Sequence, residues 1–367
     1  MFTNPAHAGD FPADGTGASQ TDLQTNAQTG APPCARTNAA FQTKPYSMSE
    51  RLALVAADVA FGTIGWVLRL GGWPLRRALC ALLGWIGYTT FRDKKKIAHV
   101  NLDLVYGDTL GEAEKDSVIR GMFVHFVRLG LDFIFDTVYW PPERLAERVR
   151  VVGIEKLPQA LAMGRGLLCV SGHLGNWEIM CASAAAHGYD FVGVFKPPSG
   201  AVANRFIGRK RLRYGMSLVE TPEVANSTVD GVRSTVTKRS LRDEIEAIWR
   251  SGRAVAYLCD QRPRKRVMRA RFLGVENTAT AGGLVRYAVA NRVPLTFHHC
   301  VYEPDGQKLV WTIEGPTEIE DKGGDEATTA HYVQLINDWL SERIKQYPAQ
   351  WTWGHRRFER DLYGRRR

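Results

Sequence analysis

Short apolar segments alternate with segments of helical periodicity from about residue 149 onward, and this alternation constrains the fold more than any other feature. Strand candidates lie at 149–152, 167–170, 191–195, 254–258, 293–298 and 310–313. Helical candidates lie at 178–187, 204–214, 243–251, 281–291 and 326–346, after a further helical pattern at 110–137. Strands that alternate with helices at this spacing build α/β domains. The sequence therefore predicts an α/β fold in which helices flank a central sheet.

Two apolar runs precede the predicted sheet, at 52–68 and 78–91, and the first contains a single charge, Asp58. A spanning helix needs about 20 apolar residues, so each run is short for that role. Tryptophans and basic residues beside the runs are typical of membrane interfaces: Trp66, Trp73, Trp85, Arg76, Arg77 and 94–96. The pattern favours one tilted anchor helix or two helices lying partly in the membrane face. The alternative is a buried helical hairpin of a soluble domain.

Composition divides the chain into four parts. Residues 1–48 are rich in small and polar residues without hydrophobic periodicity, which predicts a disordered tail. This tail lacks the basic and apolar regions of a secretory signal. We expect membrane-associated helices at 49–97, the α/β domain at 98–360 and a basic tail at 361–367.

Charge and cysteine usage narrow the class of protein. A net charge of +10 indicates an anionic partner, such as nucleic acid, an acidic membrane surface or an acidic protein. The six cysteines form no CxxC pair, which favours a reducing compartment without disulfides. His298, His299 and Cys300 follow a strand-like segment, so we expect one of their side chains to face the core, which disfavours a metal site.

A histidine and a carboxylate follow the strand at 167–170. On a continuous helix, His173 and Glu178 would point about 140° apart. They can meet if His173 lies in a turn, which Gly172 and Gly175 would permit, and Glu178 lies on the first turn of the next helix, which Asn176 would cap. A carboxylate bound to one imidazole nitrogen fixes the tautomer and supports proton uptake at the other.

The sequence offers this base no obvious nucleophile in the enzyme. GxSxG is absent, and Cys169 lies on the buried strand. A base without such a nucleophile suggests that His173 activates a hydroxyl group of the substrate. The alternative is a histidine that only caps the end of a strand.

The segment HLGNWE, 173–178, resembles the His-x4-acidic motif of the glycerolipid-type acyltransferases, and specifically the Glu form found in the lipid A biosynthesis (lauroyl/myristoyl) acyltransferases. Four further segments resemble blocks of that family in the same order: RDKKKIAHVNLDLVYGD, GVFKPPSGAVANRFIGRKRLRYG, YLCDQRPRKRVMRARFLG and QWTWGHRRFERD. The resemblance covers nearly all of 50–360. Lys196 departs from it, since the family often has arginine there, and so do the dense basic run after Gln261 and the N-terminal tail.

The resemblance implies a central mixed sheet and an enzyme that moves a fatty acyl chain from acyl carrier protein to a hydroxyl group of a phosphorylated lipid A precursor. His173 would be the general base and Glu178 would orient it. No metal or cofactor is expected. Expected substrate-binding residues are Asn176, Lys196, Arg209, Arg211 and Asp260. Arg209 or Arg211 could also bind the oxyanion.

Two of the expected roles have alternatives. Asp260 either holds one of the arginines or caps a strand end. The segment HRRF, 355–358, either binds phosphate or belongs to a solvated basic tail. The family's location implies the bacterial inner membrane, with the active site facing the cytoplasm.

Three other functions remain open at this point. The acceptor could be a mannosylated inositol lipid or another lysolipid, with acyl-CoA as donor. The basic charge, with Trp351, Trp353 and Phe358 among arginines, also fits a nucleic-acid-binding protein, although no helix-turn-helix, zinc-finger or RRM signature occurs. A catalytically inactive protein that docks on membranes is the third.

Overall fold

The computed structural model describes residues 47–141, 144–195, 207–208, 210–211, 213–220, 240–263 and 267–364. The expected disordered tail, apart from residues 47 and 48, lies outside these residues, as do Lys196, Arg209, 264–266 and the last three residues.

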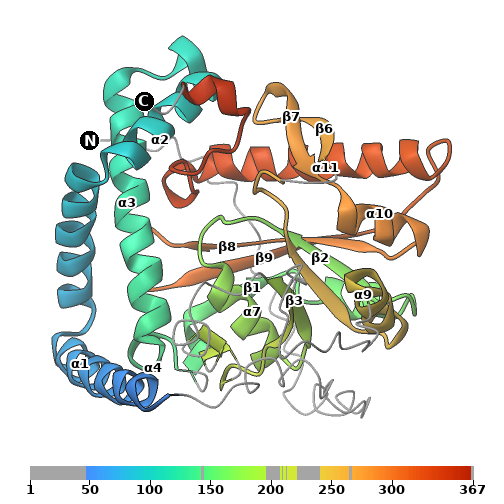
Figure 1. Cartoon of the computed structure of the whole chain (residues 1–367). Coiled ribbons are helices and arrows are strands. Elements are labelled where there is room, and N and C mark those ends of the chain that lie inside the picture. The colour runs from blue at the N-terminus through green and yellow to red at the C-terminus, as the bar shows by residue number, and fades with distance from the viewer. Residues whose placement is uncertain are drawn as a thin grey trace, which may run out of the picture. The chain divides into compact units, whose positions relative to one another are not determined.

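Seven strands form a mixed sheet in the order β1-β9-β8-β2-β5-β3-β4 (Figure 1). All neighbours are parallel except β8 and β9, which pair antiparallel. The strands are β1 (Val149–Val152), β2 (Leu167–Ser171), β3 (Phe191–Phe195), β4 (Ser217–Glu220), β5 (Ala254–Leu258), β8 (Leu295–Tyr302) and β9 (Leu309–Thr317). The α/β fold with a central mixed sheet is therefore confirmed. A separate antiparallel hairpin consists of β6 (Val267–Phe272) and β7 (Val275–Ala281).

Strand β2 lies at the centre of the sheet, and all five of its residues are buried. Leu167 and Cys169 join one hydrophobic cluster, whereas Leu168 and Val170 join the other, because successive side chains of a strand point to opposite faces. The first cluster includes α5 (Leu145–Arg148), α6 (Lys156–Leu161) and α7 (Trp177–Ala186). The second includes α9 (Leu241–Arg250), α10 (Gly283–Ala290) and α11 (Asp325–Gln346). The sheet is thus covered on both faces, as the apolar β2 sequence requires.

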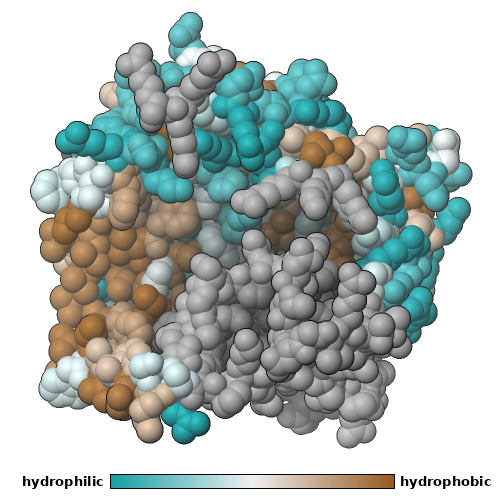
Figure 2. Space-filling view, viewed as in Figure 1, coloured by the Kyte–Doolittle hydropathy of each residue, from teal (hydrophilic) through white to brown (hydrophobic). Residues whose placement is uncertain are grey.

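The N-terminal apolar runs form one long helix, α1 (Met48–Thr90), interrupted at Gly72 and Pro74. Gly72 has φ 53° and ψ −149°, which no helical residue adopts. The helix is long and apolar enough to cross a membrane, and only 11% of its most apolar window is buried. The buried-hairpin alternative is therefore wrong, because most of the apolar surface of α1 faces outward. Figure 2 shows this surface as a brown region beside the teal, hydrophilic surface near α2.

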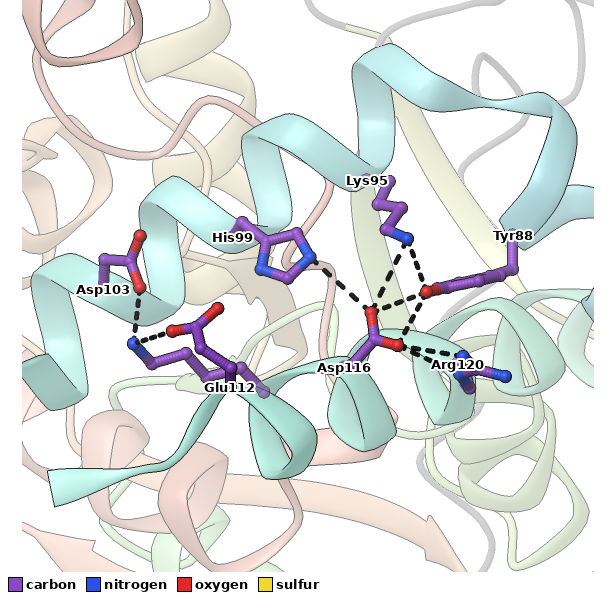
Figure 3. Close-up of polar contacts among 8 residues, drawn as sticks. Tyr88, Lys95, His99, Asp103, Glu112, Asp116 and Arg120 are labelled. Carbon is purple, nitrogen blue, oxygen red and sulfur yellow. Dashed lines mark hydrogen bonds and ion pairs between the residues drawn. The ribbon is translucent and has the colours of Figure 1, made fainter. Parts of the chain in front are cut away.

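The C-terminal arm of α1 packs on α3 (Glu112–Ile134), and α2 (Arg92–Tyr106) continues from it. Figure 3 shows the polar cluster that joins these three helices. Asp116 of α3 accepts a 2.6 Å hydrogen bond from the Tyr88 hydroxyl and a 2.9 Å hydrogen bond from Arg120. Lys95 of α2 donates to the same hydroxyl at 2.5 Å. A buried tyrosine and one carboxylate thereby hold three helices together where the chain turns from α1 into α2. Residues 136–139 form the short helix α4 (Asp136–Tyr139).

Candidate active site

His173 lies in the turn between β2 and α7, as the sequence predicts. The turn is held by the neighbouring strand: the amide of Asn176 donates to the Cys300 carbonyl at 2.7 Å. Gly175 has φ +64°, and a Cβ there would lie 1.9 Å from the same carbonyl oxygen. Only glycine fits this position, both for its backbone conformation and for its contact with β8. The turn that presents His173 is therefore fixed by the sheet.

Asp260 binds His173. The paired strands β2 and β5 end in register, with Ser171 opposite Leu258, so His173 and Asp260 each lie two residues beyond a paired strand end. Asp260 Oδ1 lies 2.7 Å from His173 Nδ1, and Oδ2 accepts a 2.9 Å hydrogen bond from the His173 amide. The carboxylate thus holds both the ring and the backbone of the histidine. Carboxyl ends of neighbouring parallel strands are the usual site position in α/β sheets.

Trp351 and Gln261 complete the surroundings of this pair. The Trp351 indole N–H donates to Asp260 Oδ2 at 2.8 Å. The other imidazole nitrogen, His173 Nε2, lies 3.2 Å from the side-chain nitrogen of Gln261, which is exposed. The His173 side chain is 18% exposed and that of Asp260 only 1%. The histidine therefore presents Nε2 outward, while Nδ1 faces a buried carboxylate.

The pKa values of the pair follow from this arrangement. Burial alone lowers the pKa of His173, but attraction to Asp260 outweighs it and raises the net pKa above the ordinary 6.5. Burial alone would raise the pKa of Asp260. The charge and hydrogen bonds of His173, together with the Trp351 N–H, instead lower it to about 2. The pair is thus built to carry an imidazolium next to a carboxylate, which is what a general base needs once it has accepted a proton.

The expected hydrogen bond between His173 and Glu178 does not form. Glu178, on the first turn of α7, instead accepts two hydrogen bonds from the Arg211 guanidinium, at 3.0 and 2.6 Å. Its charge still contributes to the raised pKa of His173, although less than that of Asp260. Asp260 makes the contact with His173 that was expected of Glu178. Glu178 makes the contact with an arginine that was one of the two roles open to Asp260.

The other expected substrate-binding residues divide into two groups. Asn176 is buried and caps α7: its side-chain oxygen accepts from the Ile179 amide at 3.0 Å, and its side-chain nitrogen donates to the Tyr302 hydroxyl at 2.7 Å. These contacts occupy its amide within the fold. Lys196 and Arg209 lie outside the described residues, so their expected roles remain predictions.

Several of the basic residues and histidines noted in the sequence analysis are buried in the fold or form ion pairs. Arg357 of the HRRF segment is fully buried, with its guanidinium over the Phe272 ring, so neither a solvated tail nor an open phosphate site describes it. Arg262 and Arg269 both bind Glu359. His298, His299 and Cys300 follow one another on β8 and are all buried. Among the described residues, no group of three His, Cys, Asp or Glu side chains is placed to hold a metal ion.

The sequence analysis did not predict two residues that lie at the site. Gln261 immediately follows Asp260, and Trp351 lies in the QWTWGHRRFERD block. Both lie in segments that the resemblance had marked, but nothing in their spacing placed them beside His173. Trp351 lies there because Leu174, in the turn between β2 and α7, forms a β-bridge with it.

The model of the bacterial lipid A biosynthesis acyltransferase family matches residues 47–360, which include α1, the whole sheet and the His173–Asp260 pair. The chain belongs to this family. It is an acyltransferase, and the nucleic-acid-binding reading that its charge left open is set aside.

Individual relatives of this acyltransferase have low sequence identity to it. The lipid A biosynthesis lauroyltransferase of Escherichia coli is 26% identical over 301 residues, which cover 80% of this chain and 88% of that protein. The E. coli palmitoleoyltransferase is 26% identical over 297 residues, 78% of this chain and 86% of that protein. A phosphatidylinositol mannoside acyltransferase of Mycolicibacterium smegmatis is 25% identical over 224 residues, covering 61% of this chain and 67% of that protein.

Proposed function

We propose that this acyltransferase moves a fatty acyl chain from acyl carrier protein to a hydroxyl group of a phosphorylated lipid A precursor. The observation that carries the mechanism is the hydrogen bond between His173 Nδ1 and the buried Asp260 carboxylate. A proton on Nδ1 satisfies this hydrogen bond and leaves the lone pair on Nε2, the nitrogen that the exposed Gln261 amide approaches. His173 is then the general base, and Asp260 is the residue that orients it.

The reaction proceeds by direct transfer. His173 Nε2 removes the proton of the acceptor hydroxyl while its oxygen attacks the thioester carbonyl, and a C–O bond forms. The tetrahedral oxyanion collapses, the C–S bond breaks, and the thiolate takes the proton back from the imidazolium. The exposed amide of Gln261 lies 3.2 Å from Nε2. In this mechanism it lies beside the reacting hydroxyl and supplies a donor for the developing charge.

Glu178 acts through Arg211 in this mechanism and not through a hydrogen bond to His173. Its bidentate ion pair fixes the Arg211 guanidinium, with both side chains less than one-fifth exposed. A positioned arginine suits a phosphate or an acidic sugar substituent of the acceptor. Lys196 and Arg209, from the same sequence block, would add further cations. Glu178 therefore serves binding more than proton transfer.

The whole chain fits anionic partners at a membrane. A net charge of +10 favours both acidic acyl carrier protein and a phosphorylated lipid. The outward apolar surface of α1 suits the lipid phase. We place the protein at the bacterial inner membrane with His173 facing the cytoplasm, the helices at 49–97 as the membrane-associated part and 98–360 as the catalytic domain.

The test uses detergent-purified protein, an acyl-acyl carrier protein and a phosphorylated tetra-acylated lipid A precursor, with product mass as readout. Wild type should add one acyl chain, and His173→Ala should add none. The mass increment gives the chain length. No transfer by wild type from either acyl carrier protein or acyl-CoA to this precursor would overturn the proposal.

A second candidate is acyl transfer from acyl-CoA to a mannosylated inositol lipid. The match to the phosphatidylinositol mannoside acyltransferase favours it. The same assay with acyl-CoA and that lipid distinguishes the two acceptors, since each product has its own mass.

A further inference from the structure

A buried chain of hydrogen bonds connects α1 to the turn between β2 and α7, residues 172–176, which carries His173 and is called the catalytic turn below. It begins at Arg76, just after the interruption of α1, whose guanidinium donates twice to Asp132 Oδ1, at 2.8 and 2.5 Å. Asp132 of α3 accepts a further hydrogen bond at Oδ2, from the Tyr302 hydroxyl at 2.6 Å. The Tyr302 hydroxyl in turn accepts from the Asn176 side chain at 2.7 Å.

The last residue of this chain determines where α7 begins. Asn176 lies three residues after His173 and two before Glu178, and its side-chain oxygen caps the helix through the Ile179 amide. With its side-chain nitrogen bound to Tyr302, the amide group has one orientation, and the cap oxygen faces the helix. Tyr302 and Asp132 therefore act on the catalytic turn without touching the reacting atoms.

The four side chains of this network are buried. Arg76 and Asp132 are fully buried, and Asn176 and Tyr302 are 1% and 3% exposed. Apolar residues of similar shape could stabilise such a region equally well, so a buried ionic network is weak evidence for stability. What a fully bonded polar network provides is one defined arrangement of its members. Here that arrangement includes the start of the helix that carries Glu178.

The other end of the network belongs to α1, the long apolar helix. Arg76 also donates to the Gly306 carbonyl at 3.0 Å, and its guanidinium lies 4.8 Å from the centre of the Trp73 ring. Trp73 and Arg76 lie on either side of Pro74, at the bend between the two arms of α1. One set of hydrogen bonds therefore connects the bend of α1 with the catalytic turn.

We propose that Asp132 and Tyr302 are positioning residues of the acyl transfer, which hold Asn176 and the catalytic turn in register with Arg76 at the bend of α1. The proposal rests on the acyltransferase activity for its kinetic effect, and on the structure of the turn for its physical effect. The two can be measured separately.

The experiment compares Tyr302→Phe with Tyr363→Phe in the full-length, detergent-purified protein. Tyr363 is a matched control, since it is also buried and its hydroxyl also bonds an asparagine, Asn101, at 2.6 Å. Tyr302→Phe should lower kcat by about tenfold and leave KM for both substrates within about twofold, as expected when a mispositioned group weakens only the transition state. Tyr363→Phe should leave kcat unchanged, even if it lowers the unfolding midpoint by a similar amount.

Hydrogen exchange of the peptide spanning 174–181 gives a readout that does not need activity. It should exchange faster in Tyr302→Phe than in wild type and should not change in Tyr363→Phe. If wild type transfers no acyl chain, the proposed function fails while this exchange comparison still decides the positioning role. Equal exchange and equal kcat losses in the two variants would overturn the proposal, since both hydroxyls would then be merely structural.

Arg76→Lys replaces Tyr302→Phe if the latter does not fold. Lysine retains the charge beside Asp132 but loses the fork that bonds both Asp132 and Gly306. It should lower kcat less than Arg76→Met and increase exchange at 174–181 less. Unchanged exchange in both Arg76 variants would exclude the link to α1.

Discussion

At the residue scale, the hydrogen bond between His173 Nδ1 and Asp260 Oδ1 decides which nitrogen of the imidazole can accept a proton. Asp260→Asn removes the charge that stabilises the imidazolium and can reverse the tautomer. We expect kcat to fall by about 10²- to 10⁴-fold, the range that proton-transfer groups contribute. Initial rates at saturating donor and acceptor measure this. Glu178→Gln is the matched control: it should raise KM for the acceptor more than it lowers kcat, and an equal kcat loss in both variants would contradict the assignment.

The raised pKa of His173 has a consequence for the pH profile. The base must be neutral to act, so kcat/KM should fall as the pH drops through a pKa above 6.5. In Asp260→Asn the attraction is gone while burial remains, and burial lowers the pKa of a histidine. The residual activity of that variant should therefore persist to lower pH. Glu178→Gln should move the acidic limb in the same direction but by less, and a limb that moves upward in either variant would refute this account.

Sequence reasoning found His173 and Glu178 from the HLGNWE segment but paired them with each other. The error has a physical reason. The residue that binds His173 follows β5, the neighbour of β2 in the sheet, and lies 87 residues away along the chain. Strand order is not visible in local patterns. The signal available in the sequence was that Asp260, like His173, closely follows the end of a predicted strand.

At the element scale, the catalytic turn depends on Gly175. Gly175→Ala adds both the strain of a positive φ and a Cβ that collides with the Cys300 carbonyl. Gly188, at the end of α7, also has a positive φ of +80°, but open space surrounds its Cβ position. Gly188→Ala should lower the free energy of unfolding by about 1 kcal/mol, and Gly175→Ala by about 3 kcal/mol or more. Denaturant unfolding checks both, and equal losses would show that the turn can shift away from β8.

The strands show how far the sequence could predict the elements. β1, β3 and β5 have the predicted bounds, because apolar residues dominate each of them. The hairpin β6–β7 and the strand β4 were not expected. β6 alternates exposed and half-buried residues and carries Arg269 and Arg271, so the sequence analysis noted it only as part of a dense basic run. In an antiparallel hairpin with one solvent-exposed face, apolar and polar residues only need to alternate. Six residues are too few to show this alternation clearly.

At the scale of the whole molecule, the apolar surface of α1 should determine membrane binding. Trp66 and Trp85 are 64% and 59% exposed, one on each arm. Replacing either with Glu should weaken binding to anionic vesicles by about tenfold or more, since burying a large apolar side chain contributes about 1.5–3 kcal/mol. Cosedimentation with vesicles measures the change. Leu335→Glu, an exposed leucine on α11, is the control, and a similar loss there would show that binding does not depend on α1.

The hydrogen bond from Arg76 to the Gly306 carbonyl joins residues 230 positions apart, and this separation sets an order of folding. During synthesis α1 emerges early, yet the carbonyl that completes the bonding of Arg76 emerges only when most of the chain has been made. Trp351, which holds Asp260, comes later still. Contacts of such long range form late because the intervening loop must first close. A nascent or C-terminally truncated chain that ends before residue 306 therefore contains α1 but lacks these two partners, which hold Arg76 and Asp260 in place.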